Sequence, residues 1–217
     1  MGQKRMLPYH KILVSGARGR LGSVICTRLS ADYQIIEHVR GLDLSTVIAL
    51  HQPDLIIDVT SHINILAHIA IYQRHAIPVI IGTSGISPVD ARLVCEATPF
   101  PLLIVPNFSM GFKTLIQQAV ILSSQYKVSK IIETHHNQKK DSPSGSSLFL
   151  ADRLDTTIES IRVPRYIAKH EIQFCMEGSL ITISHEVTDK SSFIPGILHA
   201  IEYISSKPSA QIYYPGS

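Results

Sequence analysis

The sequence has no tryptophan, and only three of its 217 residues are cysteines. Cys26, Cys95 and Cys175 are widely spaced and form no CxxC pair, so they do not indicate a disulfide framework. Such cysteine usage is typical of a protein in a reducing cytoplasm. Charged residues are also scarce, at 17% of the chain, and the net charge of +3 is too small to indicate a nucleic-acid partner.

Long apolar segments are missing as well. No apolar stretch reaches the roughly 20 residues that a membrane-spanning helix requires. The apolar run after Lys11 is too short for a signal peptide. A myristoylation signal starting at Met1-Gly2 would need Ser or Thr where Met6 stands. We therefore expect a cytoplasmic protein with neither a membrane nor a nucleic-acid partner.

The sequence does contain an alternation of short apolar strands and helical patterns. Strands are expected at residues 11–15, 34–39, 55–59, 79–81 and 102–105, with helices after them. This alternation predicts an α/β fold with a doubly wound, parallel, Rossmann-like sheet. In such a sheet, ligands bind beyond the carboxyl ends of the strands.

The first expected strand runs into G-A-R-G-R-L-G at residues 16–22, a variant of the dinucleotide-binding turn. Glycine lets the backbone turn sharply and lie against a pyrophosphate, and the following helix supplies N–H groups. Thr60, residues 82–85 and residues 107–109 also follow strands. Together these segments favour a cofactor crevice over a series of plain turns.

The residues near the second strand leave the choice between NADH and NADPH open. A ribose-binding Asp or Glu is expected about twenty residues past the first glycine, and Glu37 lies near that distance. Arg40 follows the second strand, and Arg18 lies in the Gly-rich turn. The two arginines could receive a 2′-phosphate, or either could be a solvated surface group.

The pattern changes after Gly111 and indicates a second, smaller α+β domain. We expect an amphipathic helix at residues 113–124 and two antiparallel strands at residues 171–175 and 180–187. A last helix is expected at residues 193–206, and a final strand at residues 211–214 is expected to pack back on the first sheet. The predicted dinucleotide-binding domain is therefore 1–107, joined by 190–217. Residues 108–189 form the second predicted domain.

The densest polar stretch is E-T-H-H-N-Q-K-K-D-S-P-S-G-S-S at residues 133–147, between a short strand and a helix. His135 and His136 can hold a proton near neutral pH. Lys139 and Lys140 add fixed positive charge. The Ser-Gly-Ser segment that opens the helix offers N–H groups to anions. Taken alone, the stretch is equally compatible with a solvated loop and a helix cap.

Two other kinds of site are disfavoured by this stretch. A metal site at His135, His136 and Asp141 is disfavoured because adjacent histidines on a strand point to opposite faces. A serine hydrolase built on Ser144 would lack the G-x-S-x-G elbow.

Together these motifs resemble the dihydrodipicolinate reductase family. The resemblance rests on G-A-R-G-R-L-G, I-G-T-S-G, P-N-F-S-M-G and, most firmly, E-T-H-H-N-Q-K-K-D-S-P-S-G-S, at residues 16–22, 81–85, 106–111 and 133–146. It covers nearly the whole chain. It implies reduction of 4-hydroxy-tetrahydrodipicolinate to tetrahydrodipicolinate by NADPH or NADH, in lysine and diaminopimelate biosynthesis. It further implies that residues 108–189 are a substrate-binding and oligomerisation domain of a homotetramer. From the geometry given above for His135 and His136, we expect no metal ion.

The resemblance also implies roles for individual residues. His135 would donate the proton, and Lys139 would bind a substrate carboxylate and assist proton transfer. The substrate would also be bound by His136, Ser144, Gly145 and Ser146. The cofactor would be held by Gly16, Arg18, Gly19, Arg20, Leu21, Arg40, Gly82, Thr83, Ser84, Asn107 and Phe108.

The chain departs from the family in three respects. It is shorter between the second and third strands and in the substrate domain. Ser146 replaces the usual threonine, which keeps the hydroxyl. Ser191-Ser192 is followed by Phe193, where the family tends to have an arginine. Two alternatives therefore remain open: another nicotinamide-dependent dehydrogenase on the same scaffold, and a non-catalytic nucleotide-sensing relative.

Overall fold

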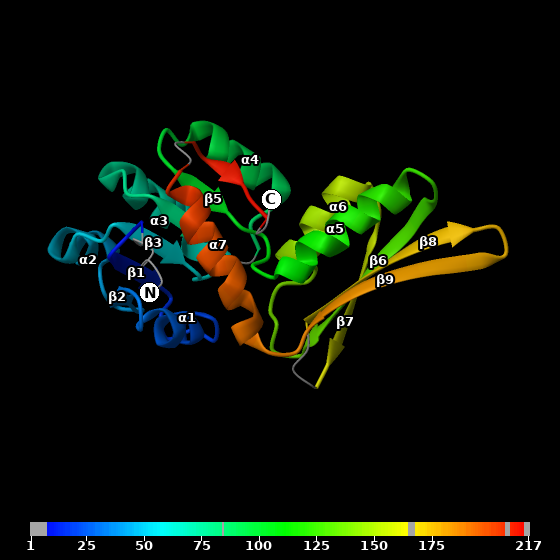
Figure 1. Ribbon diagram of the computed structural model, residues 1–217, viewed down its shortest axis with the longest axis horizontal. Coiled ribbons are helices and arrows are strands. Elements are labelled where there is room, and N and C mark those ends of the chain that lie inside the picture. The colour runs from blue at the N-terminus through cyan, green and yellow to red at the C-terminus, as the bar shows by residue number, and fades with distance from the viewer. Residues whose placement is uncertain (1–7, 84, 165–167, 207–208, 215–217) are drawn as a thin grey trace, which may run out of the picture.

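The computed structural model describes residues 8–83, 85–164, 168–206 and 209–214. They form two sheets that lie next to each other along the long axis of the molecule (Figure 1). The first sheet has the strand order β10-β5-β4-β3-β1-β2, and all its pairings are parallel. Its strands are β1 (Lys11–Ser15), β2 (Gln34–His38), β3 (Leu55–Asp58), β4 (Val79–Ile81), β5 (Leu102–Ile104) and β10 (Gln211–Ile212).

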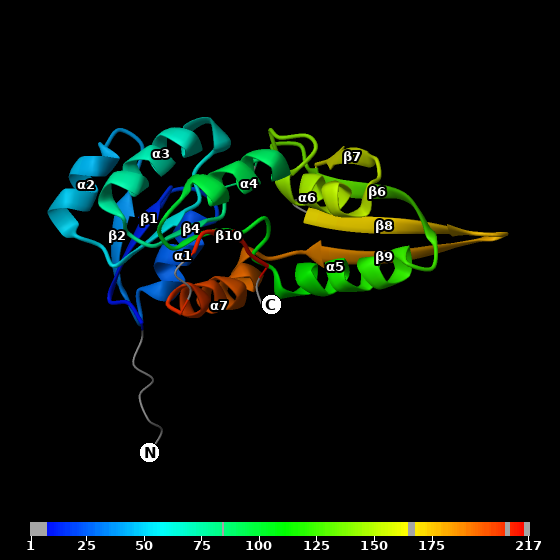
Figure 2. The same cartoon turned by 90° about the horizontal axis from the view of Figure 1, so that it is seen from above.

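Helices cover both faces of this first sheet (Figure 2). One face packs against α1 (Gly22–Leu29) and α7 (Ile194–Ile204). The other face packs against α2 (Leu44–His51), α3 (His62–His75) and α4 (Pro88–Ala97). Because both faces are covered, the central strands are buried apolar runs such as Leu-Ile-Ile in β3. The doubly wound, Rossmann-like fold expected from the sequence is confirmed.

The second sheet has the order β7-β6-β8-β9, and in the described part of the chain helices cover one of its two faces. Its pairings are antiparallel except between β6 and β7, which run parallel. α5 and α6 pack on the covered face, where Phe112 of α5 and Leu150 of α6 share one apolar core with Phe174 of β8. The elements are α5 (Met110–Ser123), β6 (Lys127–His136), α6 (Gly145–Leu154), β7 (Ile158–Val163), β8 (Ala168–Met176) and β9 (Ser179–Val187).

Several element boundaries differ from the prediction. β6 continues through His136, so both histidines of the polar stretch are strand residues and the loop after them is short. Pairing with both β7 and β8 extends the strand, because β-structure is stabilised by its neighbours rather than by local propensity. β7 was not predicted. A 3₁₀ helix, η1 (Lys190–Phe193), precedes α7.

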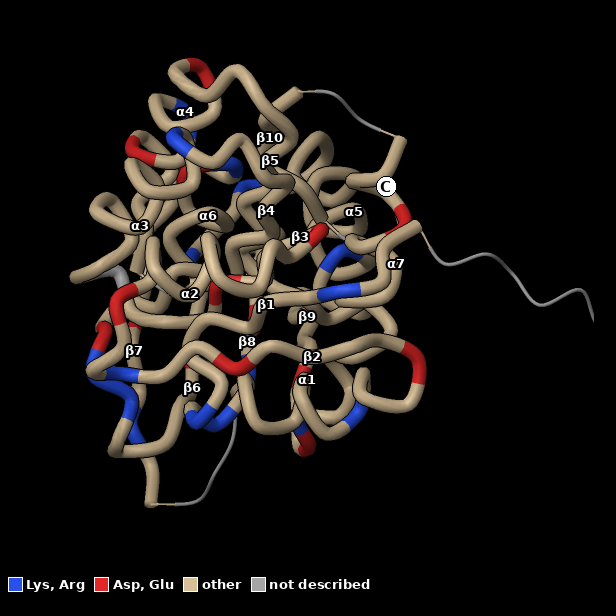
Figure 3. The backbone as a smooth tube through the Cα atoms, turned by 90° about the vertical axis from the view of Figure 1, so that its left-hand side faces the viewer, with Lys and Arg blue, Asp and Glu red and all other residues tan. Residues whose placement is uncertain are grey.

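The last strand returns to the first sheet, where β10 pairs with β5 as expected. The division into domains 1–107 with 190–217 and 108–189 stays a prediction, and the membership of the two sheets is compatible with it. In Figure 3 most of the backbone is tan, with blue and red segments scattered between, as the low charge content implies. Among the helices of the described ranges, none is long and apolar enough to cross a membrane.

Candidate active site

A cleft lies between the carboxyl-end loops of the first sheet and the β6–α6 segment of the second. Of the predicted site residues, it brings together Arg20, Leu21, Gly82, Asn107, Phe108, His135, His136, Lys139, Ser144, Gly145 and Ser146. The cleft lining does not include the other described ones, Gly16, Arg18, Gly19, Arg40 and Thr83. Ser84 lies outside the described residues.

The Gly-rich turn between β1 and α1 passes close to two other strands. Gly16 has a φ of +87°, and a Cβ there would lie 3.1 Å from the backbone of Val59, just after β3. The Gly16 N–H donates to the carbonyl of His38, at the end of β2, over 3.1 Å. Only glycine fits this conformation and this spacing. Leu21, the residue before α1, lines the cleft, so an anion in the cleft would lie near the N-terminus of α1.

The two arginines considered for a 2′-phosphate lie near the same link between β1 and β2. The Ala17 N–H also donates to the His38 carbonyl, over 3.3 Å. Arg18 follows Ala17 directly and Arg40 is two residues beyond His38, and both side chains are exposed. These backbone hydrogen bonds bring the residues Arg18 and Arg40 to the same end of β1 and β2.

The wall formed by the ends of β4 and β5 is tightly packed. A Cβ at Gly82 would lie 2.1 Å from the Phe108 ring, so the glycine is needed to seat this buried phenylalanine. The Asn107 side-chain amide donates to the Ser146 hydroxyl over 3.1 Å, and that hydroxyl donates to the Pro106 carbonyl over 2.9 Å. The first sheet is thereby attached to the start of α6.

Asp58, the last residue of β3, is a fully buried carboxylate that sequence reasoning missed. It accepts hydrogen bonds from the Tyr72 hydroxyl (2.7 Å), from the Thr60 hydroxyl (2.6 Å) and from the Thr83 hydroxyl (3.2 Å), and it pairs with His68 at 2.8 Å. Burial favours the neutral acid, but the hydrogen bonds from His68, Thr60 and Tyr72 outweigh it and lower the pKa of Asp58. The Thr83 hydroxyl thus faces Asp58. The predicted contact of Thr83 with the cofactor would therefore have to be made by its backbone.

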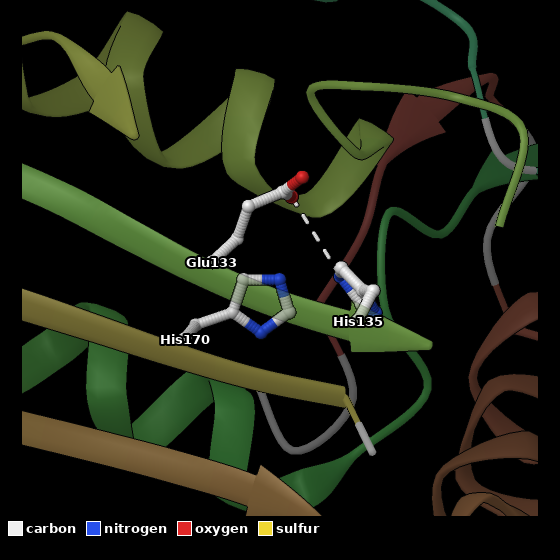
Figure 4. Close-up of side chains that lie close together, drawn as sticks. All are labelled: Glu133, His135 and His170. Carbon is white, nitrogen blue, oxygen red and sulfur yellow. Dashed lines mark ion pairs between the residues drawn. The ribbon is translucent and has the colours of Figure 1, made fainter. Parts of the chain in front are cut away.

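Three polar side chains meet on the covered face of the second sheet (Figure 4). Glu133 and His135 are two residues apart on β6, and His170 lies opposite Glu133 on β8, so all three point to the same face. The His135 Nε2 lies 3.6 Å from a Glu133 oxygen, and the His135 and His170 rings meet edge to face with centroids 5.4 Å apart. Both histidines line the cleft, and both are buried.

The Glu133 carboxylate is held by four other groups. One oxygen accepts the Ser144 N–H (2.9 Å) and the Ser147 hydroxyl (2.7 Å). The other accepts the Ser160 hydroxyl (2.9 Å) and an Arg162 N–H (3.0 Å). These donors outweigh the effect of burial and lower the pKa of Glu133 to about 2.

This hydrogen-bonding pattern bears on metal binding. The ligand atoms of Glu133, His135 and His170 lie within 4.8 Å of one another, a spacing compatible with a metal ion. Because both carboxylate oxygens already accept two donors each, the geometry favours a fixed anion beside His135 over a metal ligand. The expectation of no metal ion stays a prediction.

The expectation that His135 titrates near neutral pH is wrong for the ligand-free protein. Burial, together with the nearby Lys139 ammonium, lowers the pKa of His135 to about 4, and Glu133 offsets this only in part. Burial lowers the pKa of His170 to about 3. Both rings are therefore neutral at pH 7 unless a ligand changes the electrostatics of the cleft.

Two further predicted residues have partners within the protein. The Lys139 ammonium lies 2.9 Å from a carboxylate oxygen of Asp141. An Arg20 guanidinium nitrogen lies 2.9 Å from His136 Nε2, which connects the Gly-rich turn of the first sheet to β6 of the second. Burial and the Arg20 charge lower the pKa of His136, so its ring is a hydrogen-bonding group rather than a cation.

The start of α6 provides open N–H groups to the cleft. Ser144 is the N-cap: its hydroxyl accepts the Ser147 N–H, and its own N–H donates to Glu133. Ser144 therefore anchors the helix. Its N–H donates to Glu133 and its hydroxyl donates to the Ser147 hydroxyl, so neither is free for the predicted contact with substrate in the ligand-free protein. The N–H groups of Gly145 and Ser146 lie in the first turn, where an α-helix offers no internal acceptor.

The segment that returns from β9 to α7 also contributes to the cleft. Phe193, which stands where the family tends to have an arginine, lines it. A cation from the same segment, Lys190, lines it as well and is half-buried. Neither was predicted as a site residue, because nothing in the local sequence indicates that η1 folds back over the cleft.

The fold and this site define a nicotinamide-dependent oxidoreductase on a Rossmann-type sheet. The matched sequence patterns are described as dihydrodipicolinate reductase, N-terminus, over residues 10–108, and dihydrodipicolinate reductase, C-terminus, over residues 109–214. The chain belongs to the dihydrodipicolinate reductase family, as the resemblance implied. It is thus an NAD(P)H-dependent reductase of a family that acts in lysine and diaminopimelate biosynthesis.

Individual relatives agree with this assignment. The 4-hydroxy-tetrahydrodipicolinate reductase of Moorella thermoacetica is 27% identical over 251 aligned positions, covering 92% of this chain and 94% of that protein. The enzyme of the same name from Gloeothece citriformis is 32% identical, covering 77% and 74%. A solved structure, dipicolinate-bound dihydrodipicolinate reductase from Paenisporosarcina sp. TG-14, has a TM-score of 0.71 at 20% identity, covering 95% of this chain and 97% of that one. That likeness supports the fold.

Proposed function

We propose that this protein reduces 4-hydroxy-tetrahydrodipicolinate to tetrahydrodipicolinate in the cleft between its two sheets, with NADPH or NADH as hydride donor. One observation carries the proposal: buried His135 opens into the same cleft as the Lys139 ammonium, the first turn of α6 and the Phe108 wall. A cyclic dicarboxylate needs such a combination of a proton donor, a cation and N–H donors.

The donor set also fits a nicotinamide nucleotide. The tight turn at Gly16, the N-terminus of α1 and Arg20 suit a pyrophosphate, and Gly82 and Phe108 form a flat wall nearby. When bound, the nucleotide supplies the hydride. The chain's own residues then place the substrate and supply the proton.

We infer that the substrate itself prepares His135 for proton donation. In the ligand-free protein the Lys139 charge and burial keep the ring neutral. Two carboxylates held by Lys139 and by the N–H groups of Gly145 and Ser146 would offset that charge, and this would raise the pKa of His135. Glu133, fixed 3.6 Å from Nε2, stabilises the protonated ring. His136, held by Arg20, would accept or donate a hydrogen bond to the substrate.

NADPH is the proposed preferred cofactor, because Arg18 and Arg40 are exposed at the same end of β1 and β2, beside the Gly-rich turn. We further propose a cytoplasmic homotetramer, assembled through the face of the second sheet that α5 and α6 leave uncovered. That face presents exposed Ile161 and Leu180.

The reaction is tested directly by following NADPH and NADH oxidation by absorbance, with the aldolase-synthase product as substrate. We expect turnover with both nucleotides and a lower KM for NADPH. Arg40→Ala should raise the KM for NADPH and leave that for NADH unchanged; equal effects on both would remove Arg40 as a phosphate contact. A protein that binds NADPH but turns nothing over would support the nucleotide-sensing alternative.

A further inference from the structure

Four cations from three separate segments line the cleft together, among them Lys140 beside Lys139. Arg20 comes from the β1–α1 turn, Lys139 from the β6–α6 loop, and Lys190 from η1. Of the lining residues that the structure describes, Asp141 alone is acidic, and its carboxylate lies 2.9 Å from the Lys139 ammonium. The cleft therefore carries more positive than negative charge before any ligand binds.

Lys190 is electrostatically part of this group. Its pKa is lowered to about 8, by burial first and then by the charges of Arg20 and Lys139. Lys190 in turn contributes to the lowered pKa of His136, a cleft residue proposed to contact the substrate. A half-buried ammonium held close to two like charges loses stability, and an anion placed among the three would recover it.

We propose that Lys190 is an anion-binding residue of the cleft, which contacts a carboxylate of the substrate or a phosphate of the nucleotide. The proposal deepens the proposed function, on which it rests for the kind of ligand. Lys190 lies outside the family motifs, so they do not point to this position. The geometry does, because η1 places Lys190 on the same cleft wall as Phe193 and across the domain boundary from Lys139.

The test uses Lys190→Met, with Lys190→Arg as the conservative variant and Lys127→Met as the control. Lys127 is the exposed first residue of β6 and does not line the cleft. Lys127→Met lowers the net charge by the same amount as Lys190→Met. NADPH affinity is measured by fluorescence and pyridine-2,6-dicarboxylate affinity by calorimetry, in the presence of nucleotide. Thermal unfolding confirms that each variant is folded.

We expect Lys190→Met to lower the affinity for one of the two ligands by about 10-fold or more, because the substitution removes a charged hydrogen bond. Loss confined to the dicarboxylate assigns Lys190 to the substrate, and loss confined to NADPH assigns it to the cofactor. Lys190→Arg should retain binding, and Lys127→Met should change neither affinity. Unchanged affinities in folded Lys190→Met would overturn the proposal.

The pH dependence provides a second readout that a purely structural role would not produce. Lysine loses its charge as pH rises through its pKa, so wild-type affinity for the assigned ligand should fall above about pH 8. Arg20 and Lys139, the charged groups that face Lys190, stay in place in Lys190→Arg, which should bind evenly up to pH 10. A fall of the same size in Lys190→Arg would contradict the proposal. Both affinities are measured without turnover, so an inactive protein with Lys190-dependent binding would reject only the proposed function.

Discussion

At the scale of single residues, the site separates proton transfer from charge binding. His135 is buried beside Glu133, whereas Lys139 is paired with Asp141 nearer the solvent. We predict that His135→Gln lowers kcat by about 100- to 10,000-fold, as loss of a positioned general acid does. Lys139→Met should lower kcat and also raise the KM for the substrate, because the charge it removes costs roughly 1.5–3 kcal/mol of binding.

Inhibition by pyridine-2,6-dicarboxylate distinguishes the two roles. The inhibitor should lose potency in Lys139→Met and keep most of it in His135→Gln, since it needs the cation and the α6 N–H groups but no proton. Steady-state kinetics with both variants checks this. Turnover close to that of the wild type in both would remove the β6–α6 segment from the mechanism.

Glu133 gives a prediction about the pH dependence of stability. Its pKa is lowered from an ordinary value of 4.5 to about 2, so its charge stabilises the folded state at pH values above 4.5. This contribution, about 3 kcal/mol at neutral pH, is lost as pH falls through about 2. Urea unfolding of Glu133→Gln should therefore show a stability loss of about this size at pH 7 and a much smaller one near pH 2. A loss that does not depend on pH would show that charge is not the cause.

At the scale of elements, Asp58 connects three of them. It lies at the end of β3 and bonds Tyr72 and His68 of α3 and Thr83 after β4. We predict that Tyr72→Phe costs about 1.5–3 kcal/mol of stability, because it removes a hydrogen bond to a buried charge. Tyr203→Phe, which removes a hydroxyl that donates to the neutral Gln211 amide, is the matched control and should cost less. Equal losses in urea unfolding would argue against a special role for Asp58.

The same elements explain which parts of the structure could be predicted. β1 and β4 were placed correctly at both ends, because apolar runs bounded by turn residues carry their own signal. The cleft residues of the Gly-rich turn and of α6 followed from local motifs. Asp58, His170 and Lys190 were missed because their roles arise from contacts between segments far apart in sequence. The neutral state of His135 was also missed, since burial is a property of the packed fold.

At the scale of the whole molecule, no helix of the described residues covers the second face of the β7-β6-β8-β9 sheet. We predict a homotetramer by light scattering at micromolar concentration. Ile161→Glu, on β7, should dissociate it by placing a charge on the uncovered face, whereas a change to Glu at Val89, exposed on α4, should not. A wild-type protein that is monomeric would reject the proposal.

The return of the chain's last segment to the first sheet has a consequence for synthesis on the ribosome. α7 supplies Ile197, Ala200, Ile201 and Ile204 to the core of that sheet, and β10 adds its edge strand beside β5. When residue 108 leaves the ribosome, the sheet still lacks the helix that covers much of one face. The amino-terminal half must then wait, with apolar surface exposed, until about a hundred further residues are made. We therefore expect the first domain to complete its fold only after α7 emerges, and we expect chaperones to stay on the nascent chain until then.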